Sequence, residues 1–111
     1  MRYLTLLFLC AITVSGFSAK PDLDLIIDVR TLEEWNTGHL ASAQHIPLKE
    51  FAEQLKSLSI DKNRTVHLYC RSGNRSGKAK ALMQKLGYTH VINAGGINEA
   101  SILLQDSIVG R

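Results

Sequence analysis

The residue types that could do covalent chemistry gather around one cysteine. Cys70 follows an apolar run, 65–69, that is typical of a buried strand, and a helix-like run, 76–86, begins shortly after it. A thiol at the end of a strand, next to loop amides and a helix N-terminus, has its anionic form stabilised, and the cations Arg71 and Arg75 add to the same field. We therefore predict that Cys70 is a nucleophile in a loop that can hold an oxyanion.

Alternating strands and helices must position this loop. Apolar, β-branched runs predict the strands, and apolar residues at three- and four-residue steps predict the helices. The expected strands are 23–29, 44–46, 65–69 and 90–92, and the expected helices are 31–37, 48–58, 76–86 and 97–104, with a frayed tail beyond. Thr31 and Glu34 form a capping-box pattern at the start of the first helix. This order predicts an α/β fold, a small parallel sheet flanked by helices on both faces.

Polar and glycine residues follow three of these strands. Asp28 and Arg30 lie at the end of the first strand, the loop after Cys70 follows the third, and Gly95 and Gly96 follow the last. Because ligands bind outside the carboxyl ends of parallel strands, we expect these three segments to meet at one edge of the sheet. The sequence therefore places the candidate site at that edge.

Length and charge limit the class of protein. The chain of 111 residues has room for one compact domain, and its formal net charge is +3. The basic residues are spread along the chain rather than gathered in one run, so we expect no nucleic-acid binding. The histidines are scattered and no Cys/His cluster has zinc spacing, so we expect neither a metal nor another cofactor.

The first residues have the pattern of an export signal. A basic start, a short apolar stretch and an exit of small residues predict a secretory signal peptide over 1–19, which leaves a single domain over 20–111. We therefore expect a periplasmic protein with no stable membrane association after cleavage. Cys10 would leave with the signal, so Cys70 would remain as the single cysteine and no internal disulfide could form.

Several short motifs occur in an order that resembles a known family. They are Asp28–Arg30, Glu33–Trp35, Gly38–Leu40, Ile46–Leu48, Tyr69–Ser76 and Asn93–Gly96. In this order the chain resembles single-domain rhodaneses, which are sulfurtransferases that work through a cysteine persulfide. Within that family, the segments 47–50 and 87–91 and the tail after Gly96 resemble a small exported thiosulfate sulfurtransferase.

The resemblance implies a reaction and a set of site residues. Cys70 would attack the outer sulfur of thiosulfate, release sulfite, and hold the sulfur as a persulfide until cyanide, a small thiol or a protein thiol takes it. The implied substrate-binding residues are Arg71, Ser72, Gly73, Asn74, Arg75 and Ser76. Asp28 and Arg30 would support the loop, and an ion pair between Arg75 and Asp28 is the structural alternative to substrate binding by Arg75.

Two other functions fit the same loop. A cysteine phosphatase or arsenate reductase uses a thiolate and an arginine on a tetrahedral oxyanion. Its arginine would stand where this chain has Ser76, and Arg75 comes one residue earlier. A rhodanese-type module that binds or regulates a partner without catalysis commonly lacks the cysteine. The presence of Cys70 on a loop with two arginines favours an active sulfurtransferase.

Overall fold

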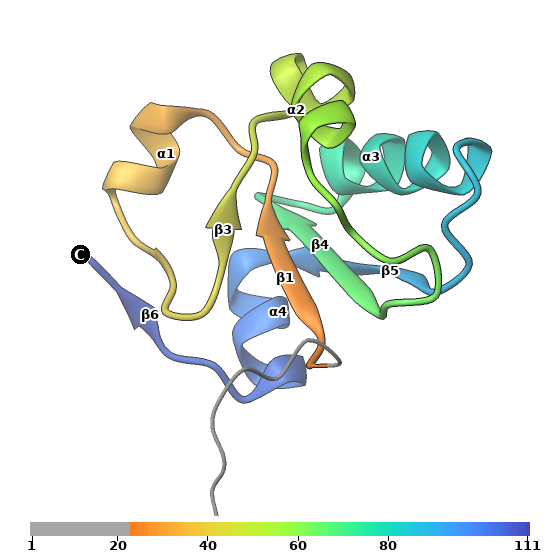
Figure 1. Ribbon diagram of the computed structural model, residues 1–111. Coiled ribbons are helices and arrows are strands. Elements are labelled where there is room, and N and C mark those ends of the chain that lie inside the picture. The colour runs from red at the N-terminus through yellow and green to blue at the C-terminus, as the bar shows by residue number, and fades with distance from the viewer. Residues whose placement is uncertain (1–22) are drawn as a thin grey trace, which may run out of the picture.

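The computed structural model describes residues 23–111 of the chain (Figure 1). The predicted signal peptide, 1–19, lies outside these residues. Within the described part of the chain, no helix is long and apolar enough to cross a membrane. The structure thus covers nearly all of the predicted domain, 20–111.

Within residues 23–111, a sheet of four parallel strands forms the centre of the fold, as the alternating pattern predicted. Its strands are β1 (Leu25–Asp28), β3 (Gln44–His45), β4 (Val66–Cys70) and β5 (Val91–Gly96), in the order β3-β1-β4-β5. The pairings of β1 with β3, β1 with β4, and β4 with β5 are all parallel. All five residues of β4 are buried, because this strand has a neighbour on each side and a helix layer over each face.

Helices cover both faces of this sheet, again as predicted. The helices α2 (Phe51–Ser57), which follows a 3-10 turn over Leu48–Glu50, and α3 (Asn74–Lys85) pack on one face, and α4 (Ile97–Leu104) packs on the other (Figure 1). Alternation along β4 separates the two cores, so that Leu68 and Cys70 face α2 and α3, whereas Tyr69 faces α4. Cys70 therefore lies on the side of the sheet that α3 covers.

Two predicted boundaries near the site differ from the structure. α3 begins at Asn74 rather than at residue 76, because Gly73 caps it with φ at 99°, in the left-handed region that favours glycine. β5 continues to Gly96, beyond the predicted end at residue 92, because Cys70 and Gly96 remain paired across an irregularity in the ladder. The earlier start of α3 shortens the loop after Cys70, and the longer β5 brings its last residue against that loop.

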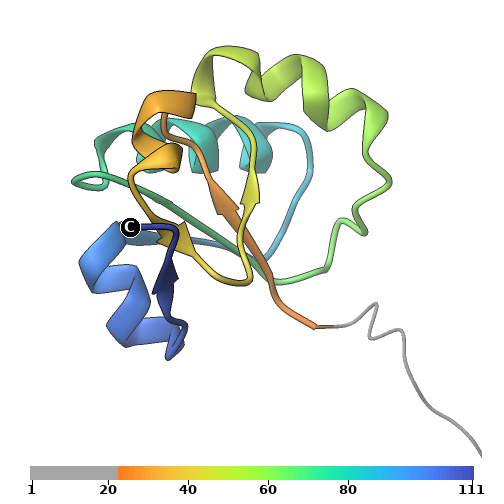
Figure 2. The same cartoon turned by 90° about the vertical axis from the view of Figure 1, so that its left-hand side faces the viewer.

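The tail after α4 forms a strand, so the prediction that it is frayed is wrong. This strand, β6 (Ile108–Val109), pairs antiparallel with β2 (His39–Leu40). Next to it, Asp106 accepts hydrogen bonds from the amide and the hydroxyl of Ser42 at 2.8 and 2.9 Å. The C-terminal residue therefore lies between α1 (Leu32–Asn36) and α4 (Figure 2).

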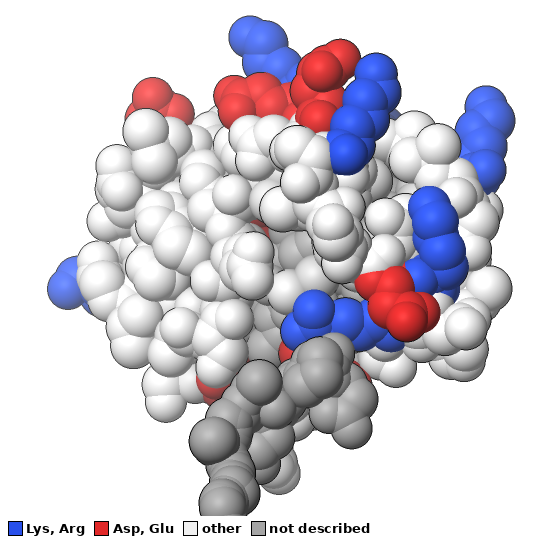
Figure 3. Space-filling view, viewed as in Figure 1, with Lys and Arg blue, Asp and Glu red and all other residues white. Residues whose placement is uncertain are grey.

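Charged side chains do not form one basic patch on the face shown in Figure 3. Lysine and arginine are interspersed with aspartate and glutamate, and acidic side chains gather along the top of the view, over α1 and α2. The ion pair between Lys56 and Glu53 of α2 is largely exposed. The charges on this face are therefore mostly solvated and of mixed sign.

Candidate functional site

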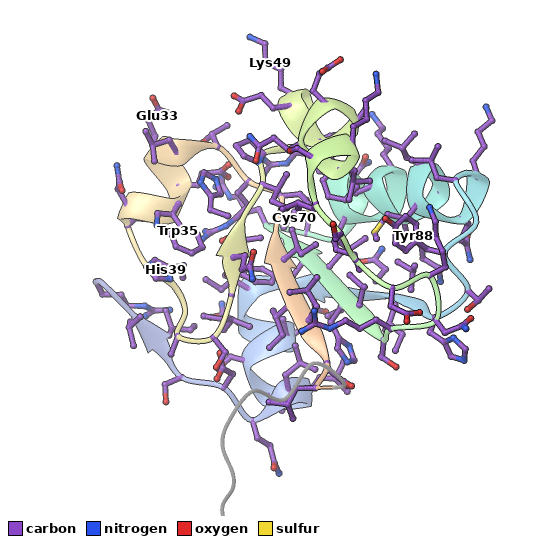
Figure 4. All side chains as sticks on the ribbon, viewed as in Figure 1. Glu33, Trp35, His39, Lys49, Cys70 and Tyr88 are labelled. Carbon is purple, nitrogen blue, oxygen red and sulfur yellow. The ribbon has the colours of Figure 1, made fainter. Side chains whose placement is uncertain are left out.

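Cys70, the last residue of β4, lies at the carboxyl end of the sheet (Figure 4). Only 1% of the residue is exposed, and its Sγ accepts hydrogen bonds from the Gly73 amide at 2.9 Å and the Ser76 hydroxyl at 3.4 Å. Burial raises the pKa of this thiol, but hydrogen bonds from Ser76 and from the amides of Ser72 and Gly73 outweigh it and lower the pKa to about 7. The loop therefore stabilises a thiolate near neutral pH.

Asn93, in β5, hydrogen-bonds to two residues of the cysteine loop and to Gly95. Sequence analysis did not identify it as a site residue. Its side-chain nitrogen donates to the Gly73 carbonyl at 2.9 Å, and its Oδ1 accepts from the Ser76 hydroxyl at 2.7 Å and the Gly95 amide at 3.0 Å. Ser76 has one hydroxyl proton, so Asn93 and Cys70 compete for it. A thiolate is a stronger acceptor than a thiol, so ionisation of Cys70 draws this proton toward the sulfur. An asparagine directly after the predicted strand 90–92 is the signal that could have identified this role.

The reactivity of Cys70 toward an alkylating reagent should rise with pH and reach half its maximum at a pH of about 7, because the thiolate is the reacting form. In Ser76→Ala the reactivity near neutral pH should fall about three- to tenfold, since the hydroxyl that helps to lower the pKa is gone. Iodoacetamide labelling followed by mass spectrometry across this pH range measures both proteins. Ser57→Ala, which changes an exposed serine of α2, is the control. Identical pH curves for Ser76→Ala and the parent would show that Ser76 does not stabilise the thiolate.

Arg75, in the first turn of α3, pairs with Glu34 of α1. Its two terminal nitrogens donate to the two Glu34 carboxylate oxygens at 2.7 and 2.9 Å, and both side chains are partly buried. The predicted ion pair between Arg75 and Asp28 is therefore wrong, because Asp28 is fully buried at the end of β1 and is held by Arg30. Glu34 also accepts from the amide and the hydroxyl of Thr31 at 3.0 and 3.1 Å, which confirms the predicted capping box.

This ion pair joins the cysteine loop to α1. Hydrogen bonds from Arg75, together with those from Thr31, lower the pKa of Glu34 to about 2. Both terminal nitrogens of Arg75 are engaged, so in this structure its guanidinium braces the loop instead of facing a substrate anion. Sequence analysis assigned Glu34 only to the helix cap, and nothing in its spacing indicates the contact with Arg75.

Asp28 and Arg30 form a buried ion pair at the end of β1. The Arg30 guanidinium donates to both carboxylate oxygens of Asp28, with a shortest contact of 2.7 Å, and to the Gly38 carbonyl at 2.7 Å. Among the described residues, neither side chain hydrogen-bonds to the loop 71–76. Any support that they give to Cys70 is therefore indirect, through the position of β1 and of the segment after α1.

Gly96, at the end of β5, lies directly against the cysteine loop. A Cβ at this position would be 2.5 Å from the Arg71 carbonyl oxygen, so only glycine lets the two backbones approach this closely. Arg30 and Arg71 line one cavity, which brings the end of β1 to the same place. The predicted meeting of three segments at this edge of the sheet is therefore confirmed.

The other loop side chains face solvent. Arg71, Ser72 and Asn74 are exposed, and within residues 23–111 none of them makes a side-chain hydrogen bond. Arg71 lines a cavity of about 590 Å³ between α1 and α4. Arg71, rather than Arg75, is thus the loop cation whose guanidinium is open to an anion.

The histidines near the site have packing roles. His39 stacks on Trp35 with ring centroids 3.5 Å apart (Figure 4), and the His45 ring lies 4.9 Å from the same indole. In the part of the chain that the structure describes, no group of three His, Cys, Asp or Glu side chains could hold a metal ion. The site is thus built from a thiol, backbone amides, a hydroxyl and guanidinium groups.

Comparison with known proteins places these features in a family. The family model of the rhodanese-like domain matches residues 14–101. The chain is 45% identical over 76 residues to thiosulfate sulfurtransferase PspE of Escherichia coli (strain K12), an alignment that covers 68% of this chain and 73% of that protein. It is 36% identical over 85 residues to the putative sulfur carrier protein YrkF of Bacillus subtilis (strain 168), over 74% of this chain and 45% of that protein. A solved structure, a rhodanese with anions from E. coli, superposes with a TM-score of 0.65 at 44% identity, over 69% of this chain and 91% of that one.

Proposed function

The chain belongs to the rhodanese-like domain family, and we propose that it is a thiosulfate sulfurtransferase that works through a persulfide on Cys70. The observation that carries the proposal is the contact of the Cys70 sulfur with the Gly73 amide at 2.9 Å and the Ser76 hydroxyl at 3.4 Å. Donors in this arrangement stabilise negative charge on sulfur, both in the thiolate and in a persulfide anion. The similarity to PspE, whose name states thiosulfate as its substrate, supports the choice of donor.

The first half of the proposed reaction loads the cysteine. The Cys70 thiolate attacks the outer sulfur of thiosulfate, the S–S bond of thiosulfate breaks, and sulfite leaves with the bonding electron pair. Arg71 attracts the sulfonate oxygens, because its guanidinium is exposed and unpaired among the described residues.

The second half of the proposed reaction unloads the cysteine. A thiol or cyanide attacks the outer sulfur of the persulfide, the S–S bond breaks, and Cys70 leaves as a thiolate that keeps the electron pair. Neither half needs an external oxidant, a metal or another cofactor. Since one sulfur atom is handed on through one cysteine, ping-pong kinetics are expected.

The alternative functions fit the geometry less well. A phosphatase or arsenate reductase needs its arginine free to bind the oxyanion, whereas both terminal nitrogens of Arg75 bind Glu34. A module without catalysis has no need for a thiol with a lowered pKa, whereas the pKa of Cys70 is about 7. Both observations favour sulfur transfer.

Intact-mass spectrometry tests the proposal. The purified protein should gain the mass of one sulfur atom when it is treated with thiosulfate, and cyanide or a thiol should then remove that mass. An aryl phosphate is the control substrate for the phosphatase alternative and should not be hydrolysed. A protein that hydrolyses the aryl phosphate but takes up no sulfur would overturn the assignment.

We also propose that the mature protein works in the periplasm. The support is the pattern of a secretory signal over 1–19, with small residues at its exit. N-terminal sequencing of the protein from a periplasmic extract should show a chain that begins just after Ser18 or Ala19. Recovery of the protein from the cytoplasm with Met1 still in place would contradict this proposal.

A further inference from the structure

The Ser76 hydroxyl has two acceptors within reach, and its single proton serves one of them at a time. The hydroxyl lies 2.7 Å from Oδ1 of Asn93 and 3.4 Å from Sγ of Cys70. Ser76 is fully buried, so bulk water offers this hydroxyl no third partner. The hydroxyl therefore has two orientations, one toward Asn93 and one toward the sulfur.

The acceptor on Asn93 is held in a fixed place. Its Nδ2 donates to the Gly73 carbonyl at 2.9 Å, and its Oδ1 accepts from the Gly95 amide at 3.0 Å. Exchanging the oxygen and nitrogen of this side chain would set oxygen against a carbonyl and NH₂ against an N–H, so the orientation follows from the hydrogen bonds. When the Ser76 hydroxyl turns away, Oδ1 keeps the hydrogen bond from Gly95 and is not left unsatisfied.

The charge on Sγ decides between the two orientations. A neutral thiol is a weak acceptor, so the hydroxyl donates to Asn93 while Cys70 is protonated. A thiolate is a strong acceptor, so the hydroxyl then turns to Sγ and joins the Gly73 amide, which lies 2.9 Å from the sulfur. Asn93 thus stabilises the neutral cysteine through Ser76, in the opposite direction to the donors around Sγ.

Charged side chains do not account for this contact. Those that flank the cysteine loop come from α1, α3, the end of β1 and the loop itself: Glu34, Arg75, Asp28, Arg30 and Arg71. The first four form two ion pairs, the ion pair of α2 is largely exposed, and β5 contains no charged residue. A neutral substitution of Asn93 therefore leaves every charge around Cys70 in place.

We propose that Asn93 is a positioning residue for sulfur transfer, which holds the Ser76 hydroxyl while Sγ is neutral and releases it when Sγ becomes charged. Its place in the reaction rests on the sulfurtransferase function proposed above, whereas its effect on the thiol does not. Without Asn93 the hydroxyl would always face the sulfur and the thiolate would be stabilised further. A thiolate of lower pKa is a weaker nucleophile, so Asn93 preserves the reactivity of Cys70.

The hydroxyl follows the charge on Sγ through both halves of the reaction and keeps its proton throughout. It faces Sγ in the thiolate that attacks thiosulfate. Once sulfite has left with its electron pair, Sγ is neutral and the hydroxyl returns to Asn93. When an acceptor attacks the outer sulfur, the bond to Sγ breaks, Sγ takes the electron pair, and the hydroxyl turns back to stabilise the leaving thiolate.

Asn93→Leu tests the proposal by the sign of a shift. Leucine is branched at the same atom but neither donates nor accepts, so the neutral thiol loses a hydrogen bond that the thiolate does not use. The contacts with Gly73 and Gly95 are lost in both states of the thiol and cancel. The half-point of iodoacetamide labelling, about 7 in the parent, should therefore move down by about 0.5–1 pH unit. Loss of a merely structural support would loosen the donors around Sγ and move it up.

A second background shows whether Asn93 acts through Ser76. In Ser76→Ala the half-point should no longer respond to Asn93→Leu, because the hydroxyl that joins the two groups is absent. Asn36→Leu changes an exposed asparagine of α1 that makes no side-chain hydrogen bond within residues 23–111, and should keep the parental half-point. Circular dichroism shows which variants are folded, and Asn93→Ala carries the same test if Asn93→Leu does not fold.

The two halves of sulfur transfer should respond in opposite directions. At a pH where Cys70 is fully ionised, Asn93→Leu should load sulfur from thiosulfate about two- to threefold more slowly, because its thiolate is a weaker nucleophile. It should lose that sulfur to cyanide about two- to threefold faster, because the same thiolate is a better leaving group. A structural defect would slow both halves. Intact-mass spectrometry follows both.

These measurements separate the role of Asn93 from the proposed function. Failure of the parent to load sulfur would count against the sulfurtransferase function, and the labelling curves would still decide on Asn93. An unchanged or higher half-point in folded Asn93→Leu or Asn93→Ala would overturn the role of Asn93. A downward shift of the same size in the Ser76→Ala background would overturn it as well, since Asn93 would then act without the hydroxyl.

Discussion

Replacing Cys70 with serine is expected to abolish sulfur transfer from thiosulfate. A serine hydroxyl has nearly the shape of the thiol but a far higher pKa, so it supplies no anionic nucleophile at neutral pH and forms no persulfide. Intact-mass spectrometry should show no gain of sulfur on Cys70→Ser. Thiocyanate formation from thiosulfate and cyanide should fall to the rate without protein.

Ser76→Ala should show a partial loss of sulfur loading, for comparison with the complete loss in Cys70→Ser. It keeps the thiol but removes the hydroxyl that lies 3.4 Å from Sγ, so it should load sulfur more slowly without losing the activity. Because Cys70 is buried, circular dichroism is needed to show that Cys70→Ser is folded. A folded Cys70→Ser protein that transfers sulfur at the parental rate would refute the assignment.

Breaking the ion pair between Arg75 and Glu34 is expected to have the next largest effect. Arg75→Ala should lower the free energy of unfolding by about 1–3 kcal/mol, because it removes two charge-assisted hydrogen bonds between partly buried groups. Thiosulfate loading should slow by about ten- to a hundredfold, since the turn of α3 that carries Ser76 loses its tie to α1. Urea unfolding and persulfide formation measure the two effects. Lys56→Ala, which breaks the exposed pair with Glu53, is the matched control and should change stability by no more than about 0.5 kcal/mol.

The contribution of this pair to stability depends on pH in a definite direction. The pKa of Glu34 is about 2 in the folded protein, below its ordinary value of 4.5, so on acidification the unfolded state binds the proton first. The stability that it provides is therefore complete above the ordinary pKa and is lost as the pH falls toward 2. The difference in unfolding free energy between the parent and Glu34→Gln should be largest near neutral pH and should shrink in acid. If the difference in unfolding free energy stayed constant down to a pH of about 2, this account would be contradicted.

Comparing the two partners separates the two roles considered for Arg75. If Arg75 acts only as a brace, Arg75→Ala and Glu34→Gln slow loading to a similar extent, and the double variant adds little. We expect this result, because both terminal nitrogens of Arg75 bind Glu34. A larger rise in KM for thiosulfate in Arg75→Ala than in Glu34→Gln would show that Arg75 also binds the substrate.

The sequence by itself determined the features that depend on neighbouring residues. Apolar periodicity predicted the alternating strands and helices, because burial on one or both faces imposes its own spacing on each element. The box of Thr31 and Glu34 marked the start of α1, since the capping groups lie within one helical turn. Cys70 was placed at the end of β4 and before a helix by the same local patterns, and the ordered motifs led to the family.

Only the tertiary structure decided which distant groups meet. Arg75 pairs with Glu34 and not with Asp28, the partner considered from the sequence, because Asp28 is buried against Arg30. Asn93 became part of the site because the pairing of β4 with β5 brings it beside Gly73. The tail forms β6 by pairing with β2. Because β2 lies far away in the sequence, no local pattern indicated this strand. Such contacts depend on strand register and on the reach of side chains between elements, and these leave no periodic or local pattern in the chain.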